Sequence, residues 1–170
     1  MDMQECRKKL GWDQNKKYII YMDSNKGVRT QKRRDRFEET LELLRLQYGY
    51  DVEMVVMRNV KRELIPTYMN AADLHMISSD FEGSPNSVKE CMCCNTPVVS
   101  TNVGNVYEMI GDIEGAYVVN DFTAESLAQA CDKVLKSKVP FSGRDKFLAK
   151  GYGMATVAEK LKSIYLSILR

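Results

Sequence analysis

The stretch LHMISSDFEGSPNSVKECMCC, residues 74–94, decides the fold of this chain. It opens with a short apolar run that predicts a buried strand over Leu74–Ser78. A polar loop follows, and Ser84 and Pro85 are residue types that favour the N-cap and the first position of a helix. The stretch therefore predicts a strand, a loop and a helix that runs from Pro85 to Cys94.

The same alternation of apolar runs and amphipathic segments continues on both sides of this stretch. It predicts further strands at Tyr18–Met22, Asp51–Met57, Val98–Ser100 and Gly115–Val119, and helices at Arg34–Gln47, Glu63–Ala72, Val106–Ile110, Ala124–Lys136 (capped by Asp121 or Thr123) and Asp145–Leu169, the last broken around Gly151–Gly153. Strands and helices in this alternation form right-handed βαβ units around a parallel sheet that is covered on both faces. Ligands of such sheets bind in the loops beyond the carboxyl ends of the strands.

Length and composition limit the class of protein. The 170 residues, 44% hydrophobic and 28% charged, suffice for one domain with a buried core and are few for two. The formal net charge of +2 is too close to neutral to indicate nucleic acid binding. We expect neither a membrane span nor a signal peptide, because the apolar runs are short. The odd number of cysteines favours a reducing cytoplasm over a disulfide framework.

The loop and the helix of residues 74–94 carry groups that suit a phosphorylated sugar ligand. Glu82 lies in the loop and Glu90 lies in the second turn of the expected helix. Gly83 lets a ligand approach the backbone, and the amides of residues 84–87 open the helix as an anion site. Two carboxylates that can each bridge a diol, beside amides that can hold phosphate, fit a nucleotide diphosphate sugar. In isolation, the two glutamates would be a loop carboxylate near a helix dipole and an exposed helix residue.

The surrounding sequence resembles a known family. EGSPNSVKE at residues 82–90, followed by CMCCNTPVVSTNVGNVYE at residues 91–108, is similar to the glycosyltransferase family 4 signature E-G-x-P-N-x-x-x-E-A-M-A-x-G-x-P-V-V-x-T-x-V-G-G-x-x-E. YMNAAD at residues 68–73 resembles the Y-x-x-A-D of that family. The resemblance is dense over residues 82–108 and looser over nearly the whole chain.

The resemblance implies a particular fold and partner set. Family 4 enzymes have the GT-B fold, in which two Rossmann-like domains face each other across a cleft. Residues 1–170 would form the C-terminal, donor-binding half, a single Rossmann-like three-layer α/β/α domain with a parallel sheet. Its partners would be the nucleotide-sugar donor and the absent N-terminal acceptor domain of the same enzyme. We expect no nucleic acid partner, and we expect any peripheral contact with the inner face of the membrane to come through the other half.

The resemblance also implies an activity and residue roles. The enzyme would move a sugar from a nucleotide diphosphate sugar to an acceptor, such as a saccharide or lipid-linked glycan, with retention of anomeric configuration and without a metal or another cofactor. Glu82 would bond sugar hydroxyls near the reacting carbon, and Glu90 would bond the ribose hydroxyls. The other donor-binding residues implied in this region are Gly83, Ser84, Pro85, Asn86 and Ser87, with the amides near Asn86 and Ser87 on the phosphates.

A basic loop, DSNKGVRTQKRRDRF at residues 23–37, forms the one concentrated positive stretch of the sequence. Its cations lie at or before a helix N-terminus, where each is unfavourable by ~0.3–1 kcal/mol, so the placement indicates a function more than a solvated helix face. That function would be to neutralise a leaving diphosphate. The family has an Arg and a Lys here; Lys32 best matches the Lys, as a second catalytic residue, while Arg29, Arg33 and Arg34 compete for the Arg. Nucleic acid binding is disfavoured, because no aromatic residues interleave the basic run.

Several residues are expected to be structural. Cys91 and Cys93 stand where the family has alanine, and we expect small buried thiols on the inward side of the helix, not half of a metal or redox site. Asn95 stands where the family has a glycine, at a position that needs a left-handed backbone. His75 lies inside an apolar run and is expected to be buried.

Two alternatives remain open from the sequence. The first is a stand-alone nucleotide-sugar-binding module without turnover, and the second is a GT-B relative that catalyses epimerisation or phosphorolysis, for which no signature is present. The final helix, Thr156–Leu169, resembles the family helix that packs back across the hinge. Apolar residues on its outer face, such as Ile164 or Leu166, are therefore expected to be exposed.

Overall fold

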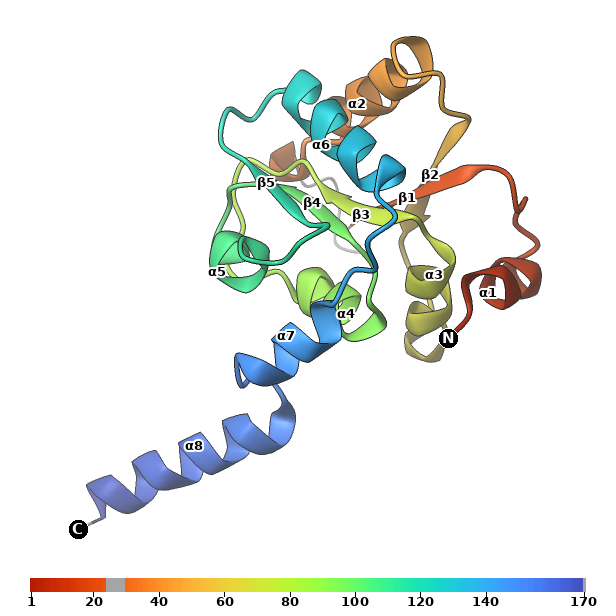
Figure 1. The fold of residues 1–170 in the computed structure, drawn as a ribbon. Coiled ribbons are helices and arrows are strands. Elements are labelled where there is room, and N and C mark those ends of the chain that lie inside the picture. Colours follow the sequence, from red (N-terminus) through yellow and green to blue (C-terminus); the bar gives the residue numbers. More distant parts are fainter. Residues whose placement is uncertain (24–29, 170) are drawn as a thin grey trace.

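The computed structural model describes residues 1–23 and 30–169, which fold around a five-stranded parallel sheet (Figure 1). The strands are β1 (Lys17–Met22), β2 (Val52–Met57), β3 (Leu74–Ile77), β4 (Val98–Thr101) and β5 (Tyr117–Val119). Their order is β2-β1-β3-β4-β5, with every neighbouring pair parallel. From β1 the chain first adds β2 on one side of β1 and then returns to add β3 on its other side. The direction of strand addition therefore reverses between β1 and β3. The loops after β1 and β3 therefore meet at the switch point, where such sheets bind ligands.

Helices cover both faces of the sheet (Figure 1). The helices of the described residues are α1 (Met3–Leu10), α2 (Arg34–Leu46), α3 (Ile65–Ala71), α4 (Asn86–Cys94), α5 (Val106–Ile110), α6 (Ala124–Lys136), α7 (Gly143–Ala149) and α8 (Met154–Ile168), with 3₁₀ turns η1 (Thr30–Lys32) and η2 (Arg62–Leu64). Helices α2 and α6 pack on one face, and α3, α4 and α5 pack on the other. The predicted three-layer α/β/α arrangement with a parallel sheet is confirmed.

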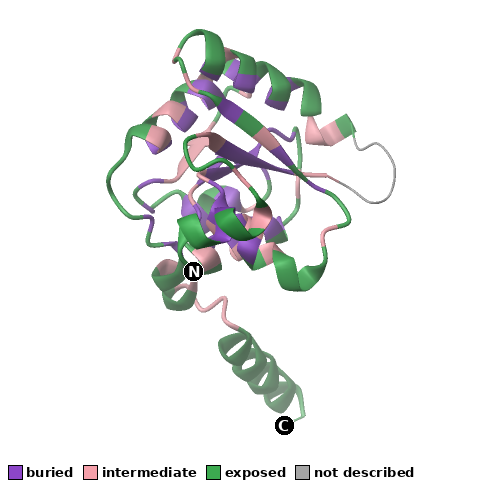
Figure 2. Cartoon of the chain, turned by 90° about the vertical axis from the view of Figure 1, so that its right-hand side faces the viewer, coloured by how far each residue is buried: buried purple, intermediate pink, exposed green. Residues whose placement is uncertain are grey.

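The core consists of one apolar cluster on each side of the sheet (Figure 2). Neighbouring residues of β1 show the division: Ile19 packs with Phe37 and Leu127 on one face, while Ile20 packs with Met69 and Val88 on the other. Both isoleucines are fully buried, which is why β1 reads as a continuous apolar run and not as an alternating pattern.

The start of α4 differs from the sequence prediction. The helix begins at Asn86, and Pro85 is its N-cap, with an extended ψ of 116° and no side-chain cap hydrogen bond. Ser84 is therefore not the cap, and Pro85 is not the first helical residue. Proline disfavours a helical conformation in the residue before it, so the helix begins only after Pro85.

Other element boundaries moved by a few residues. The segment predicted as one helix at residues 63–72 divides into η2 and α3. The last strand begins at Tyr117 and not at Gly115, which has a left-handed φ of +85°. Thr123, and not Asp121, caps α6, because its side chain accepts from the Ser126 amide at 3.2 Å. Asn95 has the predicted left-handed conformation, with φ 56°.

The C-terminal part extends away from the sheet (Figure 1). Residues between α7 and α8 break the helix as predicted, and no residue of α8 is buried. Ile164 and Leu166 are exposed, as the sequence predicts. Among the described residues, no helix has the length and apolar character needed to cross a membrane.

Candidate functional site

Two loops join at the switch point of the sheet. One contains η1 and follows β1, and the other follows β3. The Asp80 amide donates to the Gln31 carbonyl at 2.9 Å. The Ser78 hydroxyl is shared between the carbonyls of Lys32, at 2.9 Å, and Arg33, at 3.0 Å. These hydrogen bonds to main-chain carbonyls fix the position of one loop relative to the other.

Arg36 reinforces this junction from α2. Its guanidinium donates to the Ser78 carbonyl at 2.6 Å and to the Asp80 carboxylate at 2.8 Å. Arg33 donates to the same Asp80 carboxylate at 3.2 Å and also pairs with Asp35 at 2.8 Å. Asp80 thus joins two arginines that precede or begin α2 to the loop after β3. Because the Arg36 side chain is almost fully buried, its ion pair contributes to holding the loop in place.

The two residues predicted to be catalytic come together at this junction. The Lys32 ammonium donates to the Glu82 carboxylate at 2.6 Å, and the side chains are 19% and 17% exposed. The Ser79 hydroxyl donates to the same Glu82 oxygen at 2.9 Å. Ser79 is itself anchored, since its carbonyl accepts from the Thr101 hydroxyl of β4 at 2.7 Å. Glu82 is therefore held by two donors on well-fixed backbone.

The first turn of α4 opens beside this pair. The Val88 amide donates to the Pro85 carbonyl at 3.2 Å, whereas the amides of Asn86 and Ser87 have no backbone or capping acceptor among the described residues. Such amides at a helix N-terminus attract anions. The sequence analysis expects free amides over residues 84–87; Asn86 and Ser87 provide them, whereas Pro85 has no amide hydrogen to donate.

Gly83 faces open space at the mouth of the site. A Cβ at Gly83 would meet no heavy atom within 4 Å, and its φ is not left-handed. Neither packing nor backbone conformation therefore requires glycine there, and the site is open at this backbone. Gly104 differs, because a Cβ there would lie 1.9 Å from the Gly83 carbonyl oxygen and its φ is +53°. Gly104 thus supports the backbone of Gly83, to whose carbonyl the Asn105 amide also donates, at 3.1 Å.

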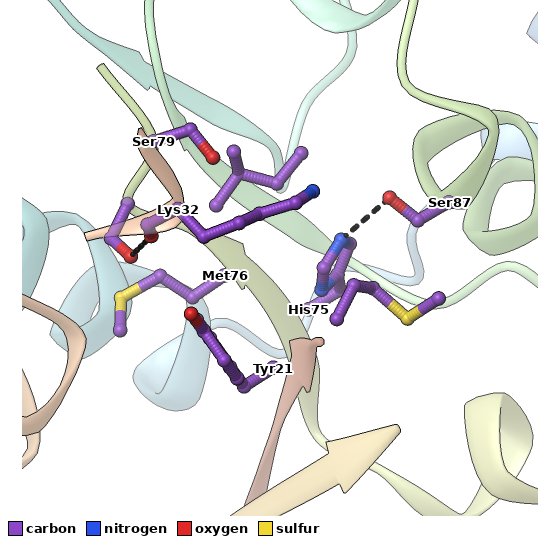
Figure 3. A pocket seen from close by; sticks show the side chains of 9 residues that line it. Tyr21, Lys32, His75, Met76, Ser79 and Ser87 are labelled. Carbon is purple, nitrogen blue, oxygen red and sulfur yellow. Dashed lines mark hydrogen bonds between the residues drawn. The ribbon is translucent and has the colours of Figure 1, made fainter. Parts of the chain in front are cut away.

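A small cavity of about 10 Å³ lies beneath Lys32 (Figure 3). Lys32, Ser79, His75 and Ser87 line it, and the Lys32 side chain reaches across it toward the side where His75 and Ser87 lie. The cavity links the Lys32–Glu82 pair to the start of α4.

His75 is buried, as predicted, and it orients Ser87. Its Nδ1 lies 3.0 Å from the Ile20 carbonyl, which can only accept, so Nδ1 carries the proton. Burial is the main cause that lowers the pKa of His75 to about 4, so the ring is neutral at pH 7. Its bare Nε2 therefore accepts from the Ser87 hydroxyl, 3.0 Å away. This bond fixes the second residue of α4 against the sheet.

Glu90 lies in a separate groove on the other side of the α4 start. The groove has a volume of about 580 Å³ and is lined by Glu90, Asn86, Arg62, Ile65 and other residues of α3, α4, α7 and α8. Glu90 is half-buried; burial raises the pKa of its carboxyl above the ordinary value, and nearby Arg62 opposes that effect. Consecutive residues Asn86 and Ser87 line the groove and the cavity respectively, so both spaces border the start of α4.

The other predicted site residues have different positions. Arg33 is engaged by Asp35 and Asp80, and Arg34 pairs with Glu38 at 2.9 Å along α2. Arg29 lies outside the described residues. Ser84 is exposed in the bend before α4, and Pro85, the N-cap of α4, is buried.

One prediction about the cysteines was wrong. Cys91 is fully buried, but Cys93 is exposed. Residues two apart on a helix point to nearly opposite sides, so both thiols could not face inward. In the part of the chain that the structure describes, no group of three or more His, Cys, Asp or Glu side chains is placed to hold a metal ion.

Sequence reasoning missed three residues of the site: Ser79, Asp80 and Arg36. Arg36 lies one turn before Thr40 on the buried side of α2, beside Phe37. An arginine on a mostly apolar helix face needs a polar partner, and this position of Arg36 is the sequence feature that could have identified it. The identity of the partner, Asp80, follows only from the packing of α2 on the switch point.

The family model described as "Glycosyl transferases group 1" matches residues 35–154. No curated protein sequence gives a match. Solved structures show the same fold: sucrose-phosphate synthase from Thermosynechococcus elongatus has a TM-score of 0.76 and 17% identity, over 99% of this chain and 49% of that one. The C-terminal domain of a group 1 glycosyl transferase (LpcC) from Francisella tularensis has a TM-score of 0.74 and 18% identity, over 90% and 94%. Anabaena Alr3699/HepE, solved with UDP and glucose, has a TM-score of 0.70 and 17% identity, over 98% and 52%.

These likenesses confirm a Rossmann-like domain of the kind that forms one half of a GT-B fold. The chain spans about half the length of the sucrose-phosphate synthase and Anabaena chains and nearly all of the Francisella domain.

Proposed function

This chain belongs to the group 1 glycosyl transferases, and we propose that it is the donor-binding domain of a retaining, family 4 enzyme. That enzyme transfers a sugar from a nucleotide diphosphate sugar to an acceptor. The observation that carries the proposal is the meeting of Lys32, Glu82 and the open amides of Asn86 and Ser87 at the switch point. A cation, a carboxylate and a helix N-terminus are the groups needed for a diphosphate joined to a sugar.

Each group has a separate task in this proposal. The amides of Asn86 and Ser87 hold the diphosphate, and Lys32 neutralises its charge as the bond to the sugar breaks. Glu82, fixed by Ser79, accepts hydrogen bonds from sugar hydroxyls. Glu90, across the α4 start, accepts from the ribose hydroxyls in the groove that it lines. Two relatives in fold, Anabaena Alr3699/HepE and TarM of S. aureus, were solved with UDP, which supports a nucleotide ligand.

Catalysis in this proposal comes from positioning and from stabilisation of the leaving group. The acceptor attacks from the face that the nucleotide leaves, which retains the anomeric configuration. The positive charge comes from Lys32 and the α4 N-terminus, so we propose that donor binding needs no metal. Binding that is unchanged in the presence of EDTA is the expected result.

The acceptor half is proposed to be another domain of the same enzyme. The 49% and 52% coverage of two relatives leaves room for a second domain of similar size. The exposed apolar residues of α8, which include Val157, Leu161 and Ile164, are proposed to pack against that domain.

Calorimetry with a panel of UDP-, GDP- and ADP-sugars tests the proposed function on this chain. We expect one class to bind, and we expect Glu90→Ala to weaken that binding. If no nucleotide sugar binds at millimolar concentration, the proposal is wrong. If binding is the same in Glu90→Ala, the ribose role of Glu90 is wrong.

A further inference from the structure

We propose that Glu82 competes with the bound diphosphate for the Lys32 ammonium, so that the site prefers a nucleotide sugar to the free nucleoside diphosphate. This inference rests on the proposed function and adds a specificity-determining role to the ion pair. The pair would favour binding of the nucleotide-sugar donor and weaken binding of the nucleoside diphosphate product.

Glu82 is held in place by two hydrogen-bond donors. Its Oε1 atom takes both the Lys32 ammonium, at 2.6 Å, and the Ser79 hydroxyl, at 2.9 Å. Ser79 is 1% exposed and is tied to Thr101 of β4. When the pair opens, the carboxylate therefore stays in place. The partner that moves is Lys32, which has a long flexible side chain.

The second point is where Lys32 can go. Lys32 and Ser87 line the same small cavity (Figure 3), and Lys32 lies close enough to His75 to lower its pKa, while Glu82 acts in the opposite direction. His75 in turn bonds the Ser87 hydroxyl. The ammonium is thus near the first turn of α4, where the diphosphate is proposed to bind. A short movement of the side chain exchanges Glu82 for a phosphate oxygen.

Among the residues that the structure describes, the neighbouring cations Arg33 and Arg36 do not replace Lys32. Arg33 is engaged by Asp35 and Asp80, and Arg36 by Asp80 and the Ser78 carbonyl. In the described residues of the two loops, Lys32 is the cation that pairs with Glu82. If Lys32 turns to phosphate, Glu82 loses its counter-charge in a site where it is largely buried.

A nucleoside diphosphate and a nucleotide sugar interact differently with the Glu82 carboxylate once it has lost Lys32. A free nucleoside diphosphate brings a terminal phosphate with additional negative charge toward the unpaired Glu82 carboxylate, which is unfavourable. A nucleotide sugar places hydroxyl groups there instead, and their hydrogen bonds satisfy the carboxylate. Glu82 therefore lowers the affinity for the nucleoside diphosphate product, whereas the sugar hydroxyls of the substrate form hydrogen bonds with it.

Calorimetry on the chain with UDP, GDP and ADP, each beside UDP-glucose, GDP-mannose and ADP-glucose, tests the inference. Glu82→Gln removes the charge but keeps the size and an oxygen for Ser79. We expect it to raise the affinity for the nucleoside diphosphate about threefold to tenfold, because no ion pair then has to open, and to lower the affinity for the nucleotide sugar. Glu82→Ala removes the carboxylate without adding an amide group that could form other contacts. It should give the same gain in affinity for the diphosphate.

A double-mutant cycle separates competition for Lys32 from general charge repulsion. In a Lys32→Met background, the gain from Glu82→Gln should become clearly smaller, because the repulsion of the terminal phosphate remains but no ion pair has to open. Glu125→Gln, which removes one exposed carboxylate from the first turn of α6, is the matched charge control and should change neither affinity.

Each outcome has a distinct meaning. If wild type binds and neither Glu82 variant gains diphosphate affinity, the inference is wrong while the proposed function stands. An equal gain with and without Lys32 also overturns it, because the effect is then repulsion alone. If neither the wild type nor any variant binds a nucleotide, the proposed function fails and the inference fails with it.

Discussion

The Lys32 ammonium lies 2.6 Å from the Glu82 carboxylate, although 50 residues separate the two in sequence. Their loops follow β1 and β3, which are adjacent strands at the point where the strand order of the sheet reverses. Contacts from Ser78, Asp80 and Arg36 hold the two loops together beneath the pair. The site is therefore built on a rigid junction, and each of the following predictions tests one part of it.

Asp80→Asn should weaken nucleotide-sugar binding about fivefold, because Asp80 connects Arg33 and Arg36 to the loop that carries Glu82. Loss of one partner of the nearly buried Arg36 should also lower the free energy of unfolding by about 1–2 kcal/mol. Calorimetry and urea unfolding measure the two effects. Asp35→Asn is the control: Asp35 is exposed and its ion pair is with Arg33, so its loss should cost less than about 0.5 kcal/mol. Equal effects of the two variants would argue against a positioning role for Asp80.

Gly83→Ala should reduce donor binding at least about tenfold and leave stability within about 0.5 kcal/mol of wild type. The added methyl group meets no protein atom within 4 Å, so it can clash only with a ligand. Gly104→Ala, by contrast, should lower stability, because its Cβ would meet the Gly83 carbonyl and its φ is +53°. We expect a loss of about 2 kcal/mol or more in unfolding free energy for Gly104→Ala. Undiminished donor binding by Gly83→Ala would show that the ligand does not approach this backbone.

Glu90 gives donor binding a dependence on pH. Burial raises the pKa of its carboxyl, so Glu90 gains a proton at a higher pH than an exposed glutamate would. Protonation removes the charge that strengthens the hydrogen bonds from ribose hydroxyls, so affinity should fall as the pH is lowered from 7.5 toward 5. Glu90→Gln should bind more weakly at pH 7.5 and should lose this part of the pH dependence. Parallel pH profiles for wild type and Glu90→Gln would contradict the assignment.

His75 should make the fold sensitive to mild acid. Burial lowers its pKa to about 4, against an unfolded value of 6.5. Above pH 6.5 the ring is neutral in both states, and below it the unfolded chain binds a proton that the folded chain resists. The free energy of unfolding should therefore fall between pH 6.5 and about 4, by up to about 3 kcal/mol.

The matched variant for this effect is His75→Asn, which does not titrate. Urea unfolding at pH 7.5, 5.5 and 4.5 should show a steeper loss for wild type than for the variant, because other titrating groups are common to both. The same slope in both proteins would contradict the buried, neutral state of His75.

The sequence alone predicts much of the sheet and part of the site. Apolar runs such as Tyr18–Met22 are buried on both faces, so they stand out without any tertiary information. The positions of Lys32 and Glu82 beyond neighbouring strands follow from parallel topology. Their direct pairing does not, because it depends on how the two loops pack.

Helix α1 shows why some elements escape sequence reasoning. It has little apolar character, and its key residue, Arg7, is buried through a 2.6 Å ion pair with Asp73 and a hydrogen bond to the Ala71 carbonyl. A long-range ion pair leaves no periodic apolar pattern in the sequence. The local signals that were present are Asp2, which caps the helix through the Glu5 amide, and Gly11, which ends it in a left-handed conformation.

The most direct test of the central claim is a nuclear magnetic resonance titration of the ¹⁵N-labelled chain with nucleotide sugars. The account predicts that the amide resonances of Asn86 and Ser87 shift on binding, and that Lys32→Met weakens the interaction. Amides far from the site, such as that of Val139, should not move. Binding that leaves Asn86 and Ser87 unshifted and that is insensitive to Lys32→Met would contradict the placement of the diphosphate at the start of α4.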